Sequence, residues 1–211
     1  IYRHCVMHDE ALTAKAFELF PLLSKFKNFY LAGGTALALH IGHRLSVDFD
    51  LFSSLPLQPQ LLRQIKTIFV KSKIEVTYKT PEQLNLIIDG IKYTFFFFEY
   101  PVIHPFVVYK NVPILKVQEL ASMKAFSIGK RLSYKDYVDW YFLLKENCVH
   151  LPDIIRLAKK KFGHDFNDRL FLGQLVSLGD VPTQKIDFLR GEIGRRTIQK
   201  FLEQAVRKYK I

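Results

Sequence analysis

The hydrophobic positions in the first half of the chain follow two different periods. Apolar residues at helical spacing predict a helix over residues 9–20, and helices are also expected over residues 35–41 and 59–70. Between them, a short apolar segment at residues 29–32 and an alternating segment at residues 47–52 predict strands. This half is therefore expected to combine helices with a β-sheet.

The clearest local signal is a β-hairpin. Residues 84–88 and 91–98 are mostly apolar, and the Asp89-Gly90 pair between them favours the type I′ turn that joins two strands. The four consecutive phenylalanines at residues 95–98 predict a strand buried on both faces, since an exposed segment this apolar would promote aggregation. Two further strands are expected, at residues 74–78 and 112–115.

The second half of the chain has a different pattern. Helical periodicity dominates it, over residues 117–129, 134–146, 152–162, 165–176 and 184–208. The sequence therefore predicts two domains, an α/β domain over residues 1–115 and a helical domain over residues 116–211.

Composition excludes several classes of protein. Of the 211 residues, 49% are hydrophobic and 24% are charged, which is typical of a globular protein and excludes a disordered chain. Apolar segments such as residues 93–98 are far shorter than the ~20 residues that a membrane span needs. The two cysteines, Cys5 and Cys148, provide neither a disulfide framework nor a zinc site. A reducing, cytoplasmic location is the expectation.

The net charge adds a hint about partners. Lys and Arg number 31 against 20 Asp and Glu, which gives +11, and the isoelectric point is about 9.6. Such a surface attracts polyanions such as nucleic acid. The alternative is a charge that only maintains solubility.

Two acids stand out in the segment that follows the first glycines. On a strand, Asp48 and Asp50 point to the same face, where two carboxylates about 4 Å apart repel by roughly 4 kcal/mol at an effective dielectric of 20. A divalent cation turns this repulsion into ligation, and Mg²⁺ takes such carboxylates together with substrate phosphates. The alternative is a solvated strand face whose acids pair with Arg44 or a lysine.

The glycines upstream change the balance between these alternatives. Gly33 and Gly34 follow a strand and precede a helix, with Thr35 expected near the N-cap. Glycine lets the backbone approach a phosphate, and a helix N-terminus presents free N–H groups to an anion. A tight turn with no ligand is the alternative. The segment is neither a Walker A loop nor a dinucleotide-binding fingerprint.

These residues together carry a family resemblance. Gly33-Gly34, thirteen residues, and then Asp48-Phe49-Asp50 resemble the first motif of the DNA polymerase β-type nucleotidyltransferase superfamily. The longer string LAGGTALALHIGHRLSVDFDLF is similar to the AbiEii-type nucleotidyltransferase toxins of bacterial toxin–antitoxin and phage-defence systems. The resemblance is specific here, moderate over residues 116–144 and weak near the C-terminus. It implies an α+β fold, with a mixed sheet flanked by helices followed by a C-terminal helical bundle.

The resemblance also implies an activity. An enzyme of this family moves a nucleoside monophosphate from a nucleoside triphosphate (NTP) to an acceptor, here RNA and most naturally tRNA. Asp48 and Asp50 would hold one or two Mg²⁺ ions, with Mn²⁺ as a substitute. A neighbouring antitoxin protein is an expected partner. The residues expected to bind the nucleotide are Gly33, Gly34, Thr35, Arg44, Ser46 and Lys124.

The second half supplies matching residues. Lys124 is the polar residue on an otherwise apolar helical face, and the resemblance implies that it meets the nucleotide phosphates. A snorkelling lysine is the alternative. The string from Arg131 to Asp139 resembles the third motif of the family, with Asp136 in a catalytic role. Because an acid on the apolar side of a helix needs a partner, Lys124 or Arg131 is expected to pair with Asp136. A purely structural salt bridge is the alternative.

One departure from the superfamily pattern matters. Many members carry a third metal-binding carboxylate on a later strand, where this chain has Thr94 and, further on, Glu99. Thr94 and Glu99 differ in parity and cannot share a regular strand face. Three outcomes stay open: Glu99 reaches in after a bulge, the site works with two carboxylates, or the protein is a catalytically impaired nucleotide- or RNA-binding module.

Overall fold

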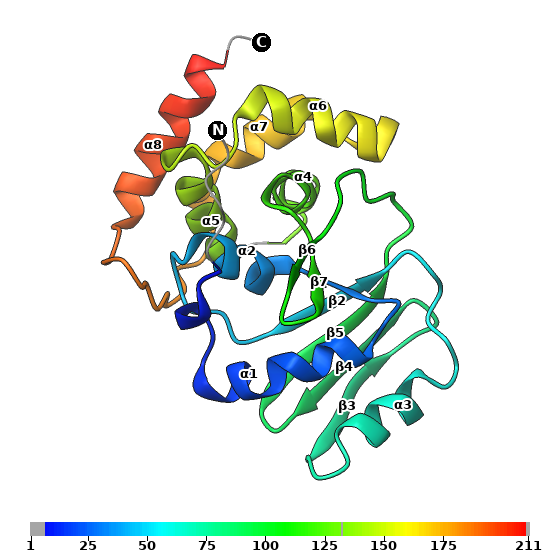
Figure 1. The fold of residues 1–211 in the computed structure, drawn as a ribbon. Coiled ribbons are helices and arrows are strands. Elements are labelled where there is room, and N and C mark those ends of the chain that lie inside the picture. The colour runs from blue at the N-terminus through cyan, green and yellow to red at the C-terminus, as the bar shows by residue number, and fades with distance from the viewer. Residues whose placement is uncertain (1–6, 132, 210–211) are drawn as a thin grey trace. The chain divides into compact units, whose positions relative to one another are not determined.

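The computed structural model describes residues 7–131 and 133–209, and the chain divides into two compact units. Unit 1 is Ile1–Lys116 and unit 2 is Val117–Ile211. Strands are confined to unit 1 in the described residues, and unit 2 is helical, so the α+β class is confirmed (Figure 1). No helix in the described part of the chain combines the length and the apolar character needed to span a bilayer.

The described residues of unit 1 form one mixed sheet with strand order β3-β4-β5-β2-β1-β7-β6. β2 lies at its centre, parallel to β5 on one side and antiparallel to β1 on the other. The strand bounds are β1 Tyr30–Ala32, β2 Phe49–Ser53, β3 Ile74–Lys79, β4 Gln83–Ile88, β5 Ile91–Phe97, β6 Val107–Tyr109 and β7 Val112–Ile114. The sequence pattern did not predict β6, which has only three residues.

The hairpin prediction is confirmed, but the phenylalanine prediction is partly wrong. β4 and β5 pair antiparallel, and both Asp89 (φ 49°) and Gly90 (φ 83°) adopt the left-handed conformation that a type I′ turn requires. Phe95 is fully buried and packs edge-on against Phe26, with 5.0 Å between the two ring centroids. Phe96 is only half-buried, because its side of the strand faces the other side of the sheet.

The helices of unit 1 differ in their bounds from the pattern: α1 and α3 are shorter than predicted, and α2 begins two residues earlier. The helix expected over residues 9–20 is interrupted because Thr13 caps a new start, its hydroxyl accepting a 3.2 Å hydrogen bond from the backbone N–H of Ala16. The observed elements are η1 Asp9–Ala11, α1 Ala14–Leu19, η2 Phe20–Lys25, α2 Gly33–Ile41 and α3 Leu61–Ile68.

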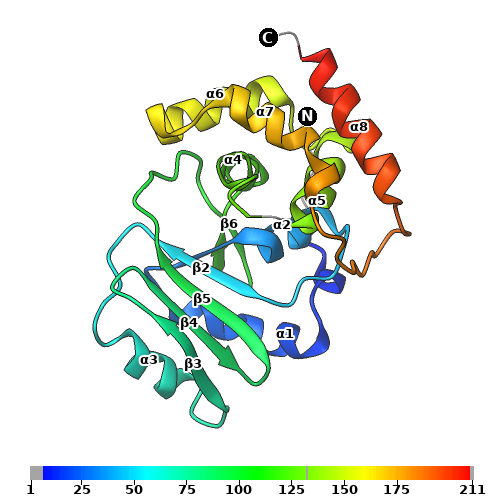
Figure 2. The same cartoon turned by 180° about the vertical axis from the view of Figure 1, so that it is seen from behind.

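The helices of unit 2 pack against one another (Figure 2). Trp140 on α5 is fully buried in this unit. The helix predicted over residues 184–208 is wrong in its first half: α8 begins only after Gly194, which is its N-cap, and Gly191 (φ 89°) turns the chain just before. The observed elements are α4 Val117–Ser127, α5 Tyr134–Lys145, α6 Leu151–Phe162, η3 Gly163–Asp165, α7 Asp168–Val176, η4 Leu178–Asp180 and α8 Arg195–Lys208.

Candidate functional site

The turn between β1 and α2 lies directly against a carboxylate of β2. Asp50 is in register with Ala32, the last residue of β1. Gly33 has a positive φ of 68°, and a Cβ added to it would overlap the Oδ2 atom of Asp50 and lie 2.9 Å from Asp50 Cγ. Glycine is therefore required twice, by the backbone conformation and by the close approach of the carboxylate. This contact joins two residues that are seventeen positions apart in the sequence.

A pair of hydroxyls ties the start of α2 to the segment before β2. The Thr35 hydroxyl donates to the backbone carbonyl of Asp48, and the Oγ atoms of Thr35 and Ser46 are 2.8 Å apart. Because a hydroxyl has one proton, Ser46 is the donor to Thr35. Thr35 is the third residue of α2 and so lies in its first turn, near the N-cap as predicted, but the N-cap itself is Ala32.

Arg44 places a positive charge beside the second glycine. Its Nη2 atom lies 2.8 Å from where a Cβ of Gly34 would be, and its Nη1 atom donates a 3.1 Å hydrogen bond to the carbonyl of Leu45. The residue is only 2% exposed. The guanidinium therefore supports the glycine turn from within unit 1.

A buried histidine holds the other end of α2. The Nε2 atom of His40 lies 2.8 Å from the carbonyl oxygen of Leu115, and burial lowers the pKa of the ring. A neutral imidazole therefore donates this hydrogen bond at neutral pH. The bond ties α2, and with it the glycine turn, to the segment after β7.

The two acids of the motif are both half-exposed. β2 begins at Phe49, so Asp48 comes immediately before the strand, rather than within a strand over residues 47–52 as predicted. Asp50 is the second residue of β2. A half-exposed carboxylate beside a glycine turn, as Asp50 is, suits Mg²⁺, a hard cation that one or two carboxylates and substrate phosphates coordinate. Among the described residues, no group of three or more His, Cys, Asp or Glu side chains is placed to hold a metal.

The position of a third carboxylate is occupied by Thr94. β2 and β5 pair in continuous register, from Phe49 opposite Tyr93 to Ser53 opposite Phe97, which places Thr94 next to Asp50. No bulge interrupts these pairs, and Glu99 lies exposed beyond the end of β5. The interpretation in which a bulge brings Glu99 into the site is therefore wrong.

The site residues expected in the second half form a buried ionic cluster in unit 2. Lys124 Nζ lies 2.8 Å from Asp136 Oδ1 and 2.6 Å from Asp139 Oδ2. The Nε and Nη2 atoms of Arg131 each donate a 2.9 Å hydrogen bond to Asp136. Both partners expected for Asp136 are thus present. Burial alone would raise the pKa of Asp136, but Lys124 and Arg131 hold it below its ordinary value.

The predicted residues therefore form two groups, one in each unit. Unit 1 brings together Gly33, Gly34, Thr35, Arg44, Ser46, Asp48 and Asp50. Unit 2 brings Lys124 and Asp136 together with Arg131 and Asp139. The expected contact of Lys124 with nucleotide phosphates stays a prediction.

The sequence pattern missed a second buried ion pair. Lys161 Nζ lies 2.5 Å from Glu119 Oε2, and both side chains are fully buried. The pair joins α6 to α4. A signal was present, because Lys161 falls three residues after Ala158 on the apolar stripe of its helix.

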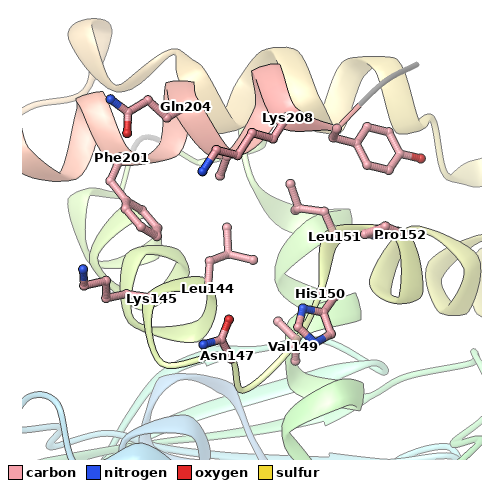
Figure 3. Close-up of a pocket in the computed structure, with 12 residues that line it drawn as sticks. Leu144, Lys145, Asn147, Val149, His150, Leu151, Pro152, Phe201, Gln204 and Lys208 are labelled. Carbon is pink, nitrogen blue, oxygen red and sulfur yellow. The ribbon is translucent and has the colours of Figure 1, made fainter.

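A pocket of about 750 Å³ also lies within unit 2, between the end of α5, the segment that follows it and α8 (Figure 3). Its walls combine apolar side chains such as Leu144 and Phe201 with the amines of Lys145 and Lys208. None of the predicted site residues lines it.

Comparison with known proteins identifies a family. Residues 17–110 match the family described as "Nucleotidyl transferase AbiEii toxin, Type IV TA system". An uncharacterized protein of Aquifex aeolicus is 31% identical over 202 residues, which cover 92% of this chain and 94% of that protein.

Two solved structures from Helicobacter pylori share the fold. A candidate nucleotidyltransferase has a TM-score of 0.61 at 18% identity and covers 93% of this chain and 96% of its own. The protein JHP933 has a TM-score of 0.58 at 19% identity and covers 93% of this chain and 94% of its own.

Proposed function

Because the chain belongs to the AbiEii nucleotidyltransferase toxin family, we propose that it transfers a nucleoside monophosphate from an NTP to RNA, with tRNA as the first candidate, in an Mg²⁺-dependent reaction. The observation that carries this proposal is the packing of the Gly33 turn against the Asp50 carboxylate. The backbone that would bind phosphate and the side chain that would hold the metal are therefore adjacent in unit 1.

The residues of the unit 1 site have different roles in binding the triphosphate. The backbone of Gly33 and Gly34 at the start of α2 approaches the phosphates, where N–H groups and the helix dipole favour negative charge. Arg44 adds its charge from behind this turn. Thr35 and Ser46 fix the segment that leads to Asp48.

Asp48 and Asp50 would hold the metal. When bound, Mg²⁺ neutralises charge that develops on the phosphate oxygens. In the reaction, the acceptor hydroxyl oxygen forms a bond to the α-phosphorus, and the bond from that phosphorus to the pyrophosphate oxygen breaks. The hydroxyl proton leaves to solvent, and pyrophosphate is the second product. The protein contributes positioning and electrostatic stabilisation, which are the main terms in such transfers.

An antitoxin partner follows from the family, which is described as one half of a type IV toxin–antitoxin system. The net charge of +11 supports a polyanionic acceptor.

The test is a transfer assay. Purified protein is incubated with total RNA and with each α-labelled NTP in turn, with Mg²⁺ or with EDTA. We expect label in RNA from at least one NTP, with Mg²⁺ only. Absence of label in RNA with every NTP would contradict the proposed activity.

A catalytically impaired nucleotide- or RNA-binding module is the second candidate. It is favoured by Thr94, which stands beside Asp50 where many members of the superfamily have an acid. Binding of an NTP without dependence on Mg²⁺, together with no labelled product, would favour this module.

A further inference from the structure

A row of polar side chains continues from Asp50 across the sheet, in the direction away from the glycine turn. Thr94 on β5 is in register with Asp50. Asn85 on β4 is in register with Thr94, and Tyr78 on β3 is in register with Asn85. Residues directly opposite one another on neighbouring strands share one face of a sheet. The row Thr94–Asn85–Tyr78 therefore lies on the same face as Asp50.

This row is accessible. Thr94 and Asn85 are half-buried, and Tyr78 is 50% exposed. Asn85 Oδ1 accepts a 2.9 Å hydrogen bond from the Gln83 amide, so the Asn85 amide nitrogen, with its two protons, is the group that a ligand would meet.

An aromatic ring borders the row. Phe96 lies two positions after Thr94 on β5 and therefore on the same face. It is half-buried, and its ring centroid is 5.2 Å from that of Phe52. Proteins bind unpaired bases by stacking aromatic rings on their faces and by hydrogen-bonding amides and hydroxyls to their edges. A carboxylate, which would repel a phosphate backbone, is absent from the row itself.

The geometry of transfer indicates which ligand lies here, and this step rests on the proposed function. The glycine turn is on the β1 side of Asp50, so the leaving pyrophosphate would lie on that side. In an in-line displacement, the attacking hydroxyl approaches from the side opposite to the leaving group. That side is β5, where Thr94 is next to Asp50.

We infer that Thr94, Asn85 and Tyr78, bordered by Gln83 and Phe96, form the site that receives the single-stranded 3′ end of the acceptor RNA. Three strand spacings separate Asp50 from Tyr78, or about 14 Å. The terminal hydroxyl lies near Thr94, and the preceding nucleotides extend toward the sheet edge. There a base stacks on Tyr78 and another base edge accepts from Asn85.

The first test compares Tyr78→Ala with Val76→Ala. Val76 lies on the same edge strand, is 42% exposed and is in register with the buried Leu86. The register of β3 on β4 shifts between Val76 and Tyr78, so these two residues, although two positions apart, are paired with opposite faces of β4. Affinity for a 5′-fluorescein single-stranded oligoribonucleotide with a free 3′ hydroxyl is measured by fluorescence anisotropy. We expect a loss of about tenfold in Tyr78→Ala, because stacking on one base contributes about 1–3 kcal/mol. Val76→Ala should bind as the unchanged protein does. Equal binding by both variants would overturn the inference, whether or not the protein is an enzyme.

The second test uses kinetics. In the transfer assay, Asn85→Ala and Tyr78→Ala should raise the KM for RNA about tenfold and leave the KM for NTP unchanged. Unchanged KM values for RNA, with an active unmodified protein, would overturn the acceptor site and leave the proposed function standing. Label found in protein instead of RNA would also overturn it, since an RNA end would then not be the acceptor.

Discussion

Two pairs of aspartates in this protein contrast sharply. Asp48 and Asp50 in unit 1 are half-exposed, and the Asp50 carboxylate lies against a glycine turn. Asp136 and Asp139 in unit 2 are at most 1% exposed and hold the amine of Lys124 between them. Burial of two carboxylates is costly unless a charged partner compensates for it, and in unit 2 the Lys124 amine does so. Both acids of the unit 1 pair are half-exposed, and this exposure suits a metal ion that arrives with its substrate.

The contrast shows that residue type alone does not separate a binding site from a structural ion pair. Both pairs lie in motifs of the family resemblance, yet their surroundings differ. Removal of charge from unit 1 should therefore change activity and leave stability nearly intact, whereas removal from unit 2 should change stability first.

The largest expected effect is on catalysis. The double variant Asp48→Asn/Asp50→Asn should lose about 10³-fold or more in nucleotide transfer, because it removes the carboxylates proposed to hold the metal. Its free energy of unfolding should change by less than about 1 kcal/mol, since both side chains are half-exposed. Labelled transfer and urea unfolding measure the two quantities. Full activity of the double variant would contradict the proposal that Asp48 and Asp50 hold the metal.

The next effect is on stability. Lys124→Met should lower the free energy of unfolding by about 3–5 kcal/mol, because it leaves two buried carboxylates without their amine. Urea unfolding measures the loss, and Lys145→Met, at an exposed lysine on α5, is the control. If Lys124→Met proved as stable as that control, the cluster would not be structural.

A smaller effect sharpens the role of the glycine turn. Gly33→Ala and Gly90→Ala both place a side chain at a positive φ, which costs each about 1–2 kcal/mol. A Cβ at Gly90 meets nothing within 4 Å, whereas one at Gly33 overlaps Asp50. Displacement of that carboxylate by about 1 Å should lower transfer about 100-fold in Gly33→Ala alone. Equal activity in the two variants would show that the contact with Asp50 has no role.

The smallest expected effect is on the pH dependence of the free energy of unfolding. The pKa of Asp136 is lowered in the folded protein, so its contribution to stability is present above the unfolded value near 3.8 and is lost as the pH falls through the folded value. The difference in unfolding free energy between the unchanged protein and Asp136→Asn should be constant from pH 7 to about 5 and should shrink below pH 3.8. A difference that stays constant down to pH 2 would contradict this assignment.

Local signals made part of this structure predictable. The Asp89-Gly90 hairpin depends on two adjacent residues and was found. The pairing of Asp136 with Lys124 and Arg131 followed from the cost of burying an acid alone. By contrast, the break before α8 was missed although Gly191 and Gly194 lie at it, because the apolar positions on both sides were assigned to one helix.

The long-range parts of the site were not predictable. The burial of Arg44 depends on packing between segments, which periodicity does not report. The row from Asp50 to Tyr78 depends on the register of four strands, and the sequence of each strand fixes only which residues alternate. The glycine turn was located by its spacing to Asp50, but its direct contact with that carboxylate depends on the register of β1 on β2.

The most direct test of the contrast between the two aspartate pairs is calorimetry with a non-hydrolysable NTP analogue, with and without Mg²⁺. The unchanged protein should bind at least one analogue, and only with Mg²⁺. The variant Asp48→Asn/Asp50→Asn should lose this binding and keep its midpoint of thermal unfolding. Equal binding by both proteins, or binding that ignores Mg²⁺, would contradict the account.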